Sequence, residues 1–557
     1  MTDGRRAPLR ERGDRPFRLV RPLRSGGGEP GLVDFHSKSM DARSSSALGG
    51  GAASLDPRMP WAAASPERGT LRSRCADWLE REAFLLPFVA VYAFLLVRVL
   101  PSLVSQDSWF TLVSGREIWR HGLPSEDGLA VFTSGAQWVD QQWLAQTLSF
   151  GLFQAGGLKL TILTHIAVLT LAYCFALWVA RRQGVSSRRL GVVAALSLFV
   201  IAPSTAFRAQ SFVYPLYIAV LWLLIADARR PSRRVFLTLP LLALWANLHG
   251  SVVLGASLVA LSGVVFAAGQ IRRRAGLRGW LPRSAALIAF PALALFASPY
   301  GFSLFGYYES TIANSSFSAF VPEWRPATFP AEAPFFVLAV VALFLVGRYG
   351  RGITLFEQLT LLVTLVGGLL AVRNGPWFGF AALAILPLTV QEAWPLKAGE
   401  RRRRRLSIVL ALGALAGLLI AAAAAVSRPG SWLERDWPSD RVAGRIARDA
   451  ERDPAVRILA DSRYADWLVW KHPELAGRIA YDIRFELLSS AQIERIANFQ
   501  NQIGVDWKAL ATGYRIVVFD AKGTDALAKS LLRERGARAL YRDKHATVIL
   551  RLPAARS

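Results

Sequence analysis

Eleven apolar runs between Ala83 and Val426 constrain what this 557-residue chain can fold into. A helix needs about 20 mostly apolar residues to cross a hydrocarbon layer of about 30 Å. Several runs reach that length, and the shorter ones suit helices that are tilted or shielded by neighbours. The pattern predicts an all-α polytopic membrane bundle of about 11–12 transmembrane helices. The runs cover residues 83–104, 158–180, 190–203, 211–226, 235–248, 251–269, 284–298, 334–347, 354–372, 376–392 and 406–426.

The basic residues decide between a membrane protein and a nucleic-acid-binding protein. Lys and Arg number 66 against 40 Asp and Glu, which gives a formal net charge of +26. Excess Arg can indicate nucleic-acid binding, but 53% of the residues are hydrophobic and the mean hydropathy is +0.30. With only Cys75 and Cys174, a disulfide-built secreted domain is also excluded. We therefore expect the charges to lie in loops at the membrane surface and predict no nucleic-acid partner.

The loops divide into two sets by their basic residues. One set holds 21 Lys and Arg: residues 181–189, 227–234, 270–283, 348–352 and 393–405. The other holds five: residues 105–142, 204–210, 247–250, 299–333 and 373–375. Cytoplasmic loops of membrane proteins carry the excess of Lys and Arg, so we predict eleven spans with the N-terminus cytoplasmic and the C-terminus outside. The segment 142–156 is ambiguous; it is short for a span and could be interfacial or re-entrant, and if it crosses, the count becomes twelve.

Two regions flank the transmembrane domain, which we place at 83–427. Residues 1–82 contain 14 Arg, one Lys and 11 acids among Gly, Ser and Pro, a composition typical of a disordered tail. No apolar core of a signal peptide follows the basic start. Residues 428–557 alternate helical stretches with β-like runs at 456–460, 478–482, 514–520 and 545–552. They predict a small C-terminal α/β domain, periplasmic by the topology.

The first outside loop, residues 105–142, is the most specific segment. Asp107 follows the first span directly and begins a short amphipathic helix. A carboxylate at the membrane surface can act as a general base or bind a divalent cation such as Mg²⁺ or Mn²⁺. The alternative is that Asp107 only caps its helix.

Several motifs in the outside loops resemble those of one bacterial group. In the first loop they are Asp107-x-Trp109, Gly115, Gly122-x-Pro124, Asp127, Trp138 and Trp143-Leu144. Elsewhere they are Arg208-Ala209-Gln210, residues 245–250, 298–301, 323–324 and 373–375, and in the C-terminal domain residues 461–468 and 481–486. These motifs are similar to those of bacterial membrane proteins related to the GT-C superfamily, glycosyltransferases that include protein mannosyltransferases and aminoarabinose transferases.

The resemblance implies an activity and a set of roles. GT-C enzymes use a polyprenyl-phosphate-linked sugar as donor, and an acid that opens the first outside loop is essential; here that acid is Asp107. Many members have two adjacent acids, whereas Ser108 follows Asp107, so Asp127 and Asp140 are the candidates for a second acid. Arg208 and Arg373 are candidates for binding the donor phosphate as planar donor forks, although an Arg at a span end can also extend its charge to the interface.

Other polar and aromatic residues gather in the same loops. Ionisable groups at membrane helices are costly, which makes them candidates for a functional site, although polar interfacial residues are also expected there. His249 in particular could belong to a turn closed by Gly250. We expect the following residues to line an outward cavity: Trp109, Trp138, Trp143, Gln210, Asn247, His249, Tyr300, Glu323, Trp324 and Asn374.

The chain lacks GxxxxGK[ST], GxSxG, HExxH and CxxC motifs. We therefore predict an inner-membrane glycosyltransferase of the cell envelope that moves a sugar from a polyprenyl-phosphate carrier to a glycan, lipid or protein acceptor. The alternative is a non-catalytic membrane protein of envelope polysaccharide assembly that binds lipid-linked glycan in the same cavity. A secondary transporter would predict an inverted repeat, which we do not find.

Overall fold

The structure, a computed structural model, describes residues 71–98, 100–202, 206–312, 321–395, 404–522 and 524–551. Most of the expected disordered tail therefore lies outside the described residues, as do 313–320 and 396–403 from two expected loops. The last part of that tail is a helix, α1 (Leu71–Glu82). Its Glu82 forms an ion pair of 2.6 Å with Arg181. Arg181 lies in the last turn of the helix at residues 143–182, so this helical part of the expected tail contacts the bundle.

Helices follow the expected apolar runs, and the expected fold class is confirmed. The helices are α2 (Leu86–Arg98), α3 (Leu100–Leu103), α4 (Gln106–His121), α5 (Trp143–Arg182), α6 (Ser187–Ile201), α7 (Tyr214–Arg229), α8 (Thr238–Ala246), α9 (Val252–Arg272), α10 (Leu277–Leu295), α11 (Leu304–Ile312), α13 (Ala333–Tyr349), α14 (Leu355–Leu370), α15 (Gly375–Ala393) and α16 (Arg404–Ser427). Short 3₁₀ turns join several of them: η2 (Ala209–Val213), η3 (Arg233–Leu237), η4 (Gly301–Ser303), η5 (Pro322–Trp324), η6 (Gly350–Gly352) and η7 (Val372–Asn374). Among the described residues, five helical stretches are long and apolar enough to cross a membrane: 143–182, 209–229, 252–272, 333–352 and 405–427.

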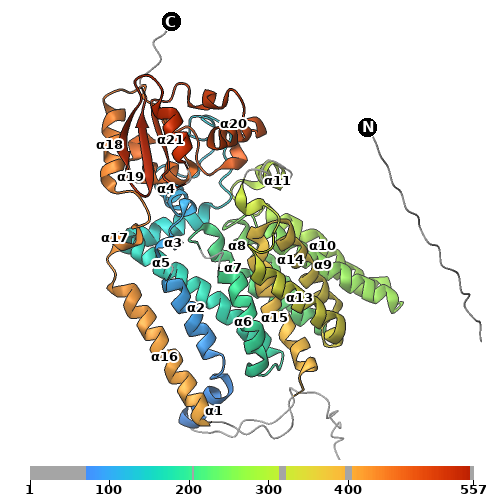
Figure 1. The fold of residues 1–557 in the computed structure, drawn as a ribbon. Coiled ribbons are helices and arrows are strands. Elements are labelled where there is room, and N and C mark those ends of the chain that lie inside the picture. The colour runs from blue at the N-terminus through green and yellow to red at the C-terminus, as the bar shows by residue number, and fades with distance from the viewer. Residues whose placement is uncertain are drawn as a thin grey trace, which may run out of the picture. The chain divides into compact units, whose positions relative to one another are not determined.

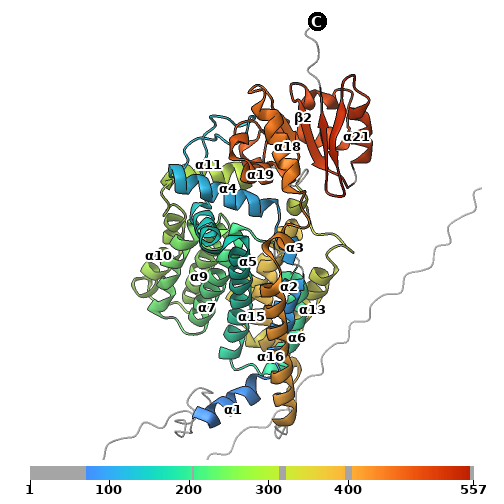
Figure 2. The same ribbon diagram turned by 90° about the vertical axis from the view of Figure 1, so that its left-hand side faces the viewer.

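Helix α5 contains the ambiguous segment 142–156. The helix has 40 residues but is kinked at Gly156 and Gly157, where φ of Gly157 is +66°, a value that glycine adopts at little cost. Before the kink it packs against α4, because the missing side chain of Gly115 leaves room for the backbone of Gln146. After the kink it follows the expected span. The segment is thus the first arm of a bent helix that lies along α4 (Figure 2).

The bundle has two distinct ends (Figure 1). Helices α4 and α11 lie at the end that carries the C-terminal domain, here called the site end. The opposite end, here called the arginine-rich end, holds the loops at 181–189, 227–234, 270–283 and 348–352. Ion pairs connect the helix ends there: Arg229 of α7 lies 2.6 Å from Glu357 of α14, and Arg283 of α10 lies 2.5 Å from Asp227 of α7. The division of the loops into two sets therefore corresponds to two ends of one bundle.

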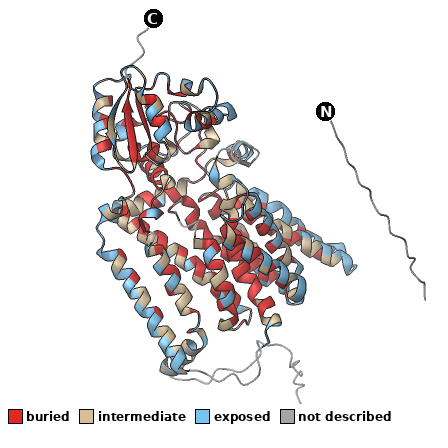
Figure 3. Cartoon of the chain, viewed as in Figure 1, coloured by how far each residue is buried: buried red, intermediate tan, exposed pale blue. Residues whose placement is uncertain are grey.

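The helices of the bundle differ in how far their residues are buried (Figure 3). Fifteen of the 19 residues of α15 are buried, and Trp377 on this helix contacts Tyr214 and Tyr217 of α7 at ring distances of 5.0 and 5.1 Å. Helix α16, in contrast, has mostly exposed apolar side chains, as expected for a helix that faces lipid. Helix α15 is therefore the packing centre of the bundle.

The C-terminal region folds around a four-stranded sheet in the order β1-β2-β4-β3, with β1 and β2 parallel and the other pairs antiparallel. The strands are β1 (Ile458–Ala460), β2 (Ile516–Asp520), β3 (Arg538–Arg542) and β4 (Ala546–Leu550). The helices are α17 (Gly430–Leu433), α18 (Asp440–Glu451), α19 (Ser462–Lys471), α20 (Ser490–Asn501) and α21 (Asp525–Leu532), with 3₁₀ turns η8 (Pro473–Leu475), η9 (Phe485–Leu487) and η10 (Trp507–Ala511).

One β assignment from the sequence is wrong, and one strand was not predicted. Residues 478–482 form only isolated bridges, because Ile479 pairs with Ala130 of the first loop and with Ile458 instead of entering a ladder. Strand β3 was not expected; its side chains are largely exposed, so it lacks the apolar alternation of a half-buried strand.

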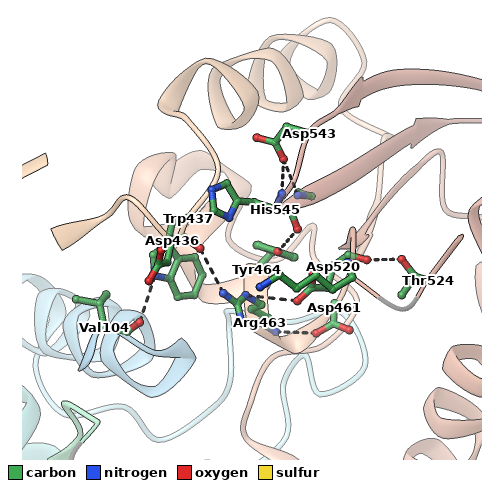
Figure 4. A network of polar contacts seen from close by, with 12 residues as sticks. Val104, Asp436, Trp437, Asp461, Arg463, Tyr464, Asp520, Thr524, Asp543 and His545 are labelled. Atoms are coloured by element: carbon green, nitrogen blue, oxygen red, sulfur yellow. Dashed lines mark hydrogen bonds and ion pairs between the residues drawn. The ribbon is translucent and has the colours of Figure 1, made fainter. Parts of the chain in front are cut away.

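The C-terminal domain is fastened to the bundle by specific polar contacts (Figure 4). Trp437 donates from its indole N–H to the carbonyl of Val104, the residue after α3, over 3.2 Å. Arg463 lies over the Trp437 ring and reaches Asp520 at the end of β2, 3.9 Å away. In the first loop, the N–H of Val131 donates to the carbonyl of Ile479 over 2.8 Å. These contacts hold the domain directly above the start of α4.

Candidate functional site

The first turn of α4 positions Asp107. The backbone N–H of Ser105 donates to the hydroxyl of Ser108 over 2.9 Å, which closes the helix start. Ser108 in turn donates to the carbonyl of Phe207 over 2.7 Å, and the N–H of Phe207 donates to Leu103 over 2.8 Å. Ser108 is thus a buried link that brings Asp107 next to Arg208.

Arg208 joins two carboxylates from distant parts of the chain. Its Nη1 and Nη2 donate to the two carboxylate oxygens of Glu323 over 2.8 and 2.9 Å. Its Nε lies 4.0 Å from an oxygen of Asp107. The Asp107 side chain is 32% exposed and that of Glu323 is 45% exposed, so both carboxylates can meet a substrate.

A second cation is held beside this group. The Arg373 guanidinium lies over the Trp324 ring, 4.7 Å from its centre, a cation–π contact. The backbone aligns the two residues, since Val372 donates to the carbonyl of Arg325 over 3.0 Å and Ala327 donates to Leu369 over the same distance. Turns η5 and η7 therefore bring Glu323, Trp324 and Arg373 to one place.

His249 completes the group between α8 and α9. Its Nδ1 accepts the backbone N–H of Ser251 over 3.0 Å, so the neutral ring carries its proton on Nε2. Burial, followed by the charges of Arg373 and Arg208, lowers the pKa of His249 well below its usual value. His249 is therefore a neutral hydrogen-bond donor close to both arginines.

Desolvation and the neighbouring charges shift the pKa values of Asp107 and Glu323 in opposite directions. Desolvation raises the pKa of Asp107 and outweighs the stabilising charge of Arg208. Desolvation also acts on Glu323, but the hydrogen bonds and charge of Arg208 dominate and lower its pKa. Glu323 is thus the ionised partner of Arg208, and Asp107 is the more basic carboxylate. A raised pKa suits a group that accepts a proton.

The expected second acids lie elsewhere. Asp127 is fully buried and forms an ion pair of 2.7 Å with Arg484. Arg484 also donates hydrogen bonds to the carboxylate of Asp482, and its guanidinium lies over the Trp138 ring, 4.3 Å from the ring centre. This network joins the first loop to the C-terminal domain. Glu323 is the acid that lies next to Arg208 and Asp107. From the sequence, Glu323 was expected only to line the cavity.

A second polar region adjoins the first. Burial raises the pKa of Asp140 to about 7, and also that of Glu486 to about 7. Asp466 on α19 has its pKa raised by burial, by Asp482 and in part by Asp107. Five side chains here have buried polar atoms without a hydrogen-bond partner in the described structure, a pattern that indicates water or a polar ligand: Asp140, Gln141, Gln146, Asp466 and Arg484. The sequence motifs contained Asp466, Arg484 and Glu486, but loop position alone did not identify them as site residues.

Several expected cavity residues make contacts that hold the structure together. Trp109 is wholly buried and packs edge-on against Trp437 at 5.5 Å, because α4 presents it to the C-terminal domain. Trp143 donates to Asn247 over 2.9 Å, and Asn247 donates to the carbonyl of Ala297 over 2.6 Å. Tyr300 donates from its hydroxyl to the carbonyl of Pro124 over 2.9 Å, and Asn374 donates to the carbonyl of Gly367 over 3.1 Å. Gln210 is buried in η2.

A divalent cation at Asp107 does not fit these donors. Mg²⁺ and similar ions need several oxygen ligands free to converge. Here the Arg208 guanidinium already joins Glu323 to Asp107, which puts a fixed positive charge where a bridging cation would bind. In the described part of the chain, no group of three or more His, Cys, Asp or Glu side chains could hold a metal ion.

Comparisons with known proteins were made on sequence and on structure. No protein-family model matches the chain, and no curated protein sequence matches it. Among solved structures it is similar to ArnT from Cupriavidus metallidurans bound to undecaprenyl phosphate, at 14% identity and a TM-score of 0.45, covering 84% of this chain and 97% of ArnT. It is also similar to the oligosaccharyltransferase AglB from Archaeoglobus fulgidus in complex with an inhibitory peptide and a dolichol-phosphate (11% identity, TM-score 0.47, 78% of this chain and 69% of AglB). A third is the arabinofuranosyltransferase AftD from Mycobacteria (13% identity, TM-score 0.43, 85% of this chain and 40% of AftD).

Proposed function

We propose that this chain is a membrane glycosyltransferase that transfers a sugar from a polyprenyl-phosphate carrier to an acceptor at the site end of the bundle. The observation that supports it most is the meeting of Asp107, Arg208, Glu323 and Arg373 next to neutral His249. An accessible basic carboxylate beside two guanidinium groups matches a reaction in which a hydroxyl loses a proton and a phosphate leaves. By the distribution of Lys and Arg, this end faces the periplasm of a bacterial inner membrane.

The reaction is a single displacement at the anomeric carbon. An acceptor hydroxyl attacks that carbon while its proton passes to Asp107. The bond between the anomeric carbon and the phosphate oxygen breaks, and its electron pair leaves with the polyprenyl phosphate. One displacement inverts the configuration of the anomeric carbon.

The cations serve the leaving group. Arg373 and Arg208 stabilise the negative charge that grows on the phosphate, and His249 donates a hydrogen bond from Nε2. Fixed donors and charges of this kind stabilise a transition state without reorganisation. Glu323 keeps Arg208 oriented through its two hydrogen bonds.

The test is transfer of a labelled polyprenyl-phosphate sugar by the full chain in proteoliposomes. Asp107→Asn should lower the rate on the order of 10²- to 10⁴-fold, the range for removing a general base. The control is Glu126→Gln, an exposed acid of the same loop, which should retain the rate. Full activity of Asp107→Asn would overturn the mechanism. Donor binding without turnover by the wild-type chain would support the non-catalytic alternative instead.

A further inference from the structure

A cavity of about 300 Å³ lies between α7, α9 and α14 at the arginine-rich end, opposite the candidate site. Arg229, Gln270, Arg273 and Thr354 contribute polar groups to its wall, and Gly269 and Phe266 lie among its apolar lining. The volume is at the lower end for small-molecule pockets. It can accept a headgroup but not a whole lipid.

The charge of this cavity is unevenly compensated. Arg229 donates to the buried carboxylate of Glu357 over 2.6 Å, and Asp227 on the same wall is paired with Arg283. Arg273 is exposed and forms no ion pair with any residue in the described ranges. The rim therefore carries one uncompensated positive charge, which favours an anionic ligand.

The surface around the cavity is suited to lipid chains. Leu355 at the start of α14 lines the cavity and is 53% exposed. Val265 and Phe266 on the cavity face of α9 are half-buried. Basic pockets between membrane helices on the side rich in Lys and Arg bind acidic lipid headgroups. A free phosphate ion would use the charge of the rim but not this apolar surface.

We propose that the cavity binds the phosphate headgroup of an anionic phospholipid. Arg273 contacts the phosphate, and Gln270 and Thr354 hydrogen-bond to headgroup hydroxyls, since the Thr354 oxygen accepts the N–H of Glu357 and keeps its own proton to donate. The acyl chains leave the cavity past the apolar side chains of Val265, Phe266 and Leu355. This site is separate from the proposed transfer reaction and does not depend on it.

Native mass spectrometry of the full chain in detergent, titrated with phosphatidylglycerol or phosphatidylcholine, tests the proposal. Gly269→Phe should fill the cavity, because a side chain at Gly269 meets no atom within 4 Å. Gly347→Phe on α13, which also meets open space but does not line the cavity, is its matched control. Arg273→Ala removes the charge, and Arg272→Ala removes a neighbouring charge outside the cavity.

We expect one phosphatidylglycerol to bind more tightly than phosphatidylcholine. Arg273→Ala should weaken this binding about fivefold, the effect of one basic residue near an acidic lipid surface. Gly269→Phe should weaken it at least as much, while both controls bind as the wild type does. Equal binding of the two lipids, or unchanged binding by Gly269→Phe, would overturn the proposal. Displacement of the lipid by millimolar inorganic phosphate would assign the cavity to a free ion and also overturn it.

Discussion

The two ends of the bundle contain the same kinds of ion pair but use them differently. At the arginine-rich end the carboxylates are buried: the side chain of Glu357 is 0% exposed and that of Asp227 is 6% exposed. At the site end, Asp107 and Glu323 pair with Arg208 while their side chains stay 32% and 45% exposed. Buried pairs connect helices, whereas accessible pairs keep their charges available to a ligand.

This difference separates stability from function. Removing one partner of a buried ion pair leaves a charge without compensation, which is strongly destabilising. Removing one partner of an accessible pair leaves a charge that water can solvate, so the loss falls on binding or catalysis. The following predictions test this division, from the largest expected effect to the smallest.

Arg208→Gln should abolish most of the transfer activity. The variant loses a charge at the leaving phosphate and releases Glu323, so we expect a decrease in kcat/KM on the order of 10²- to 10³-fold. Because the Glu323 carboxylate that loses its partner is 45% exposed, water can solvate it and the melting temperature should stay close to that of the wild type. Steady-state kinetics and thermal unfolding in proteoliposomes measure both quantities, with the exposed Arg230→Gln as control. A large loss of stability with unchanged activity would reverse the assignment of the two ends.

Arg229→Leu should have the opposite effect. It leaves the carboxylate of Glu357 buried and unpaired, which should lower the free energy of unfolding by about 3–5 kcal/mol. The rate per folded molecule should be retained. The double variant Arg229→Leu/Glu357→Leu, which removes both charges, should recover much of the stability. If the double variant is no more stable than the single one, the pair does not act as described.

The pH dependence of transfer should report Asp107. As a general base it must be ionised, so activity should rise with pH through its pKa, which lies above the usual range of an aspartate. The Arg208 charge lowers that pKa, so in Arg208→Gln the acidic limb of the residual kcat/KM should move to higher pH. If the acidic limb of the pH profile moves to lower pH in Arg208→Gln, or is the same as in the wild type, a group other than Asp107 controls the rate.

Trp324→Leu should have a smaller effect. It removes the ring under Arg373 but keeps the charge. A cation–π contact of this exposure contributes about 0.5–2 kcal/mol, so KM for the donor should rise roughly 2- to 30-fold with little change in kcat. The conservative Trp324→Phe should recover part of the loss. A decrease confined to kcat would place Trp324 in the chemical step instead.

Chelation should have the smallest effect. Arg208 occupies the position between Asp107 and Glu323, so we expect EDTA to leave the transfer rate unchanged within error. Rates with and without EDTA, followed by Mg²⁺ or Mn²⁺ addition, measure this. Loss of activity that either ion restores would show that the donors rearrange around a metal when the substrate binds.

Much of the architecture was determined by the sequence alone. Apolar runs and Arg-rich loops are local properties, because each helix must satisfy its own backbone and present apolar side chains within one continuous segment. The helical membrane fold and the small C-terminal sheet could therefore be predicted, whereas five of the eleven predicted spans are long and apolar enough in the described residues to cross a membrane. Strand β3 and the bridges of Ile479 could not, because strand pairing depends on partners elsewhere in the chain.

Only the tertiary structure decided which residues share the site. Arg208 and Glu323 are 115 positions apart, and Arg484 reaches Asp127 from the C-terminal region. Asp127 and Glu323 are both loop acids, and nothing local distinguishes the one enclosed in an ion pair from the one open to a ligand. That distinction depends on which surfaces meet when the C-terminal domain packs on the first loop. Burial and charge pairing follow from that packing, and they give each carboxylate its function.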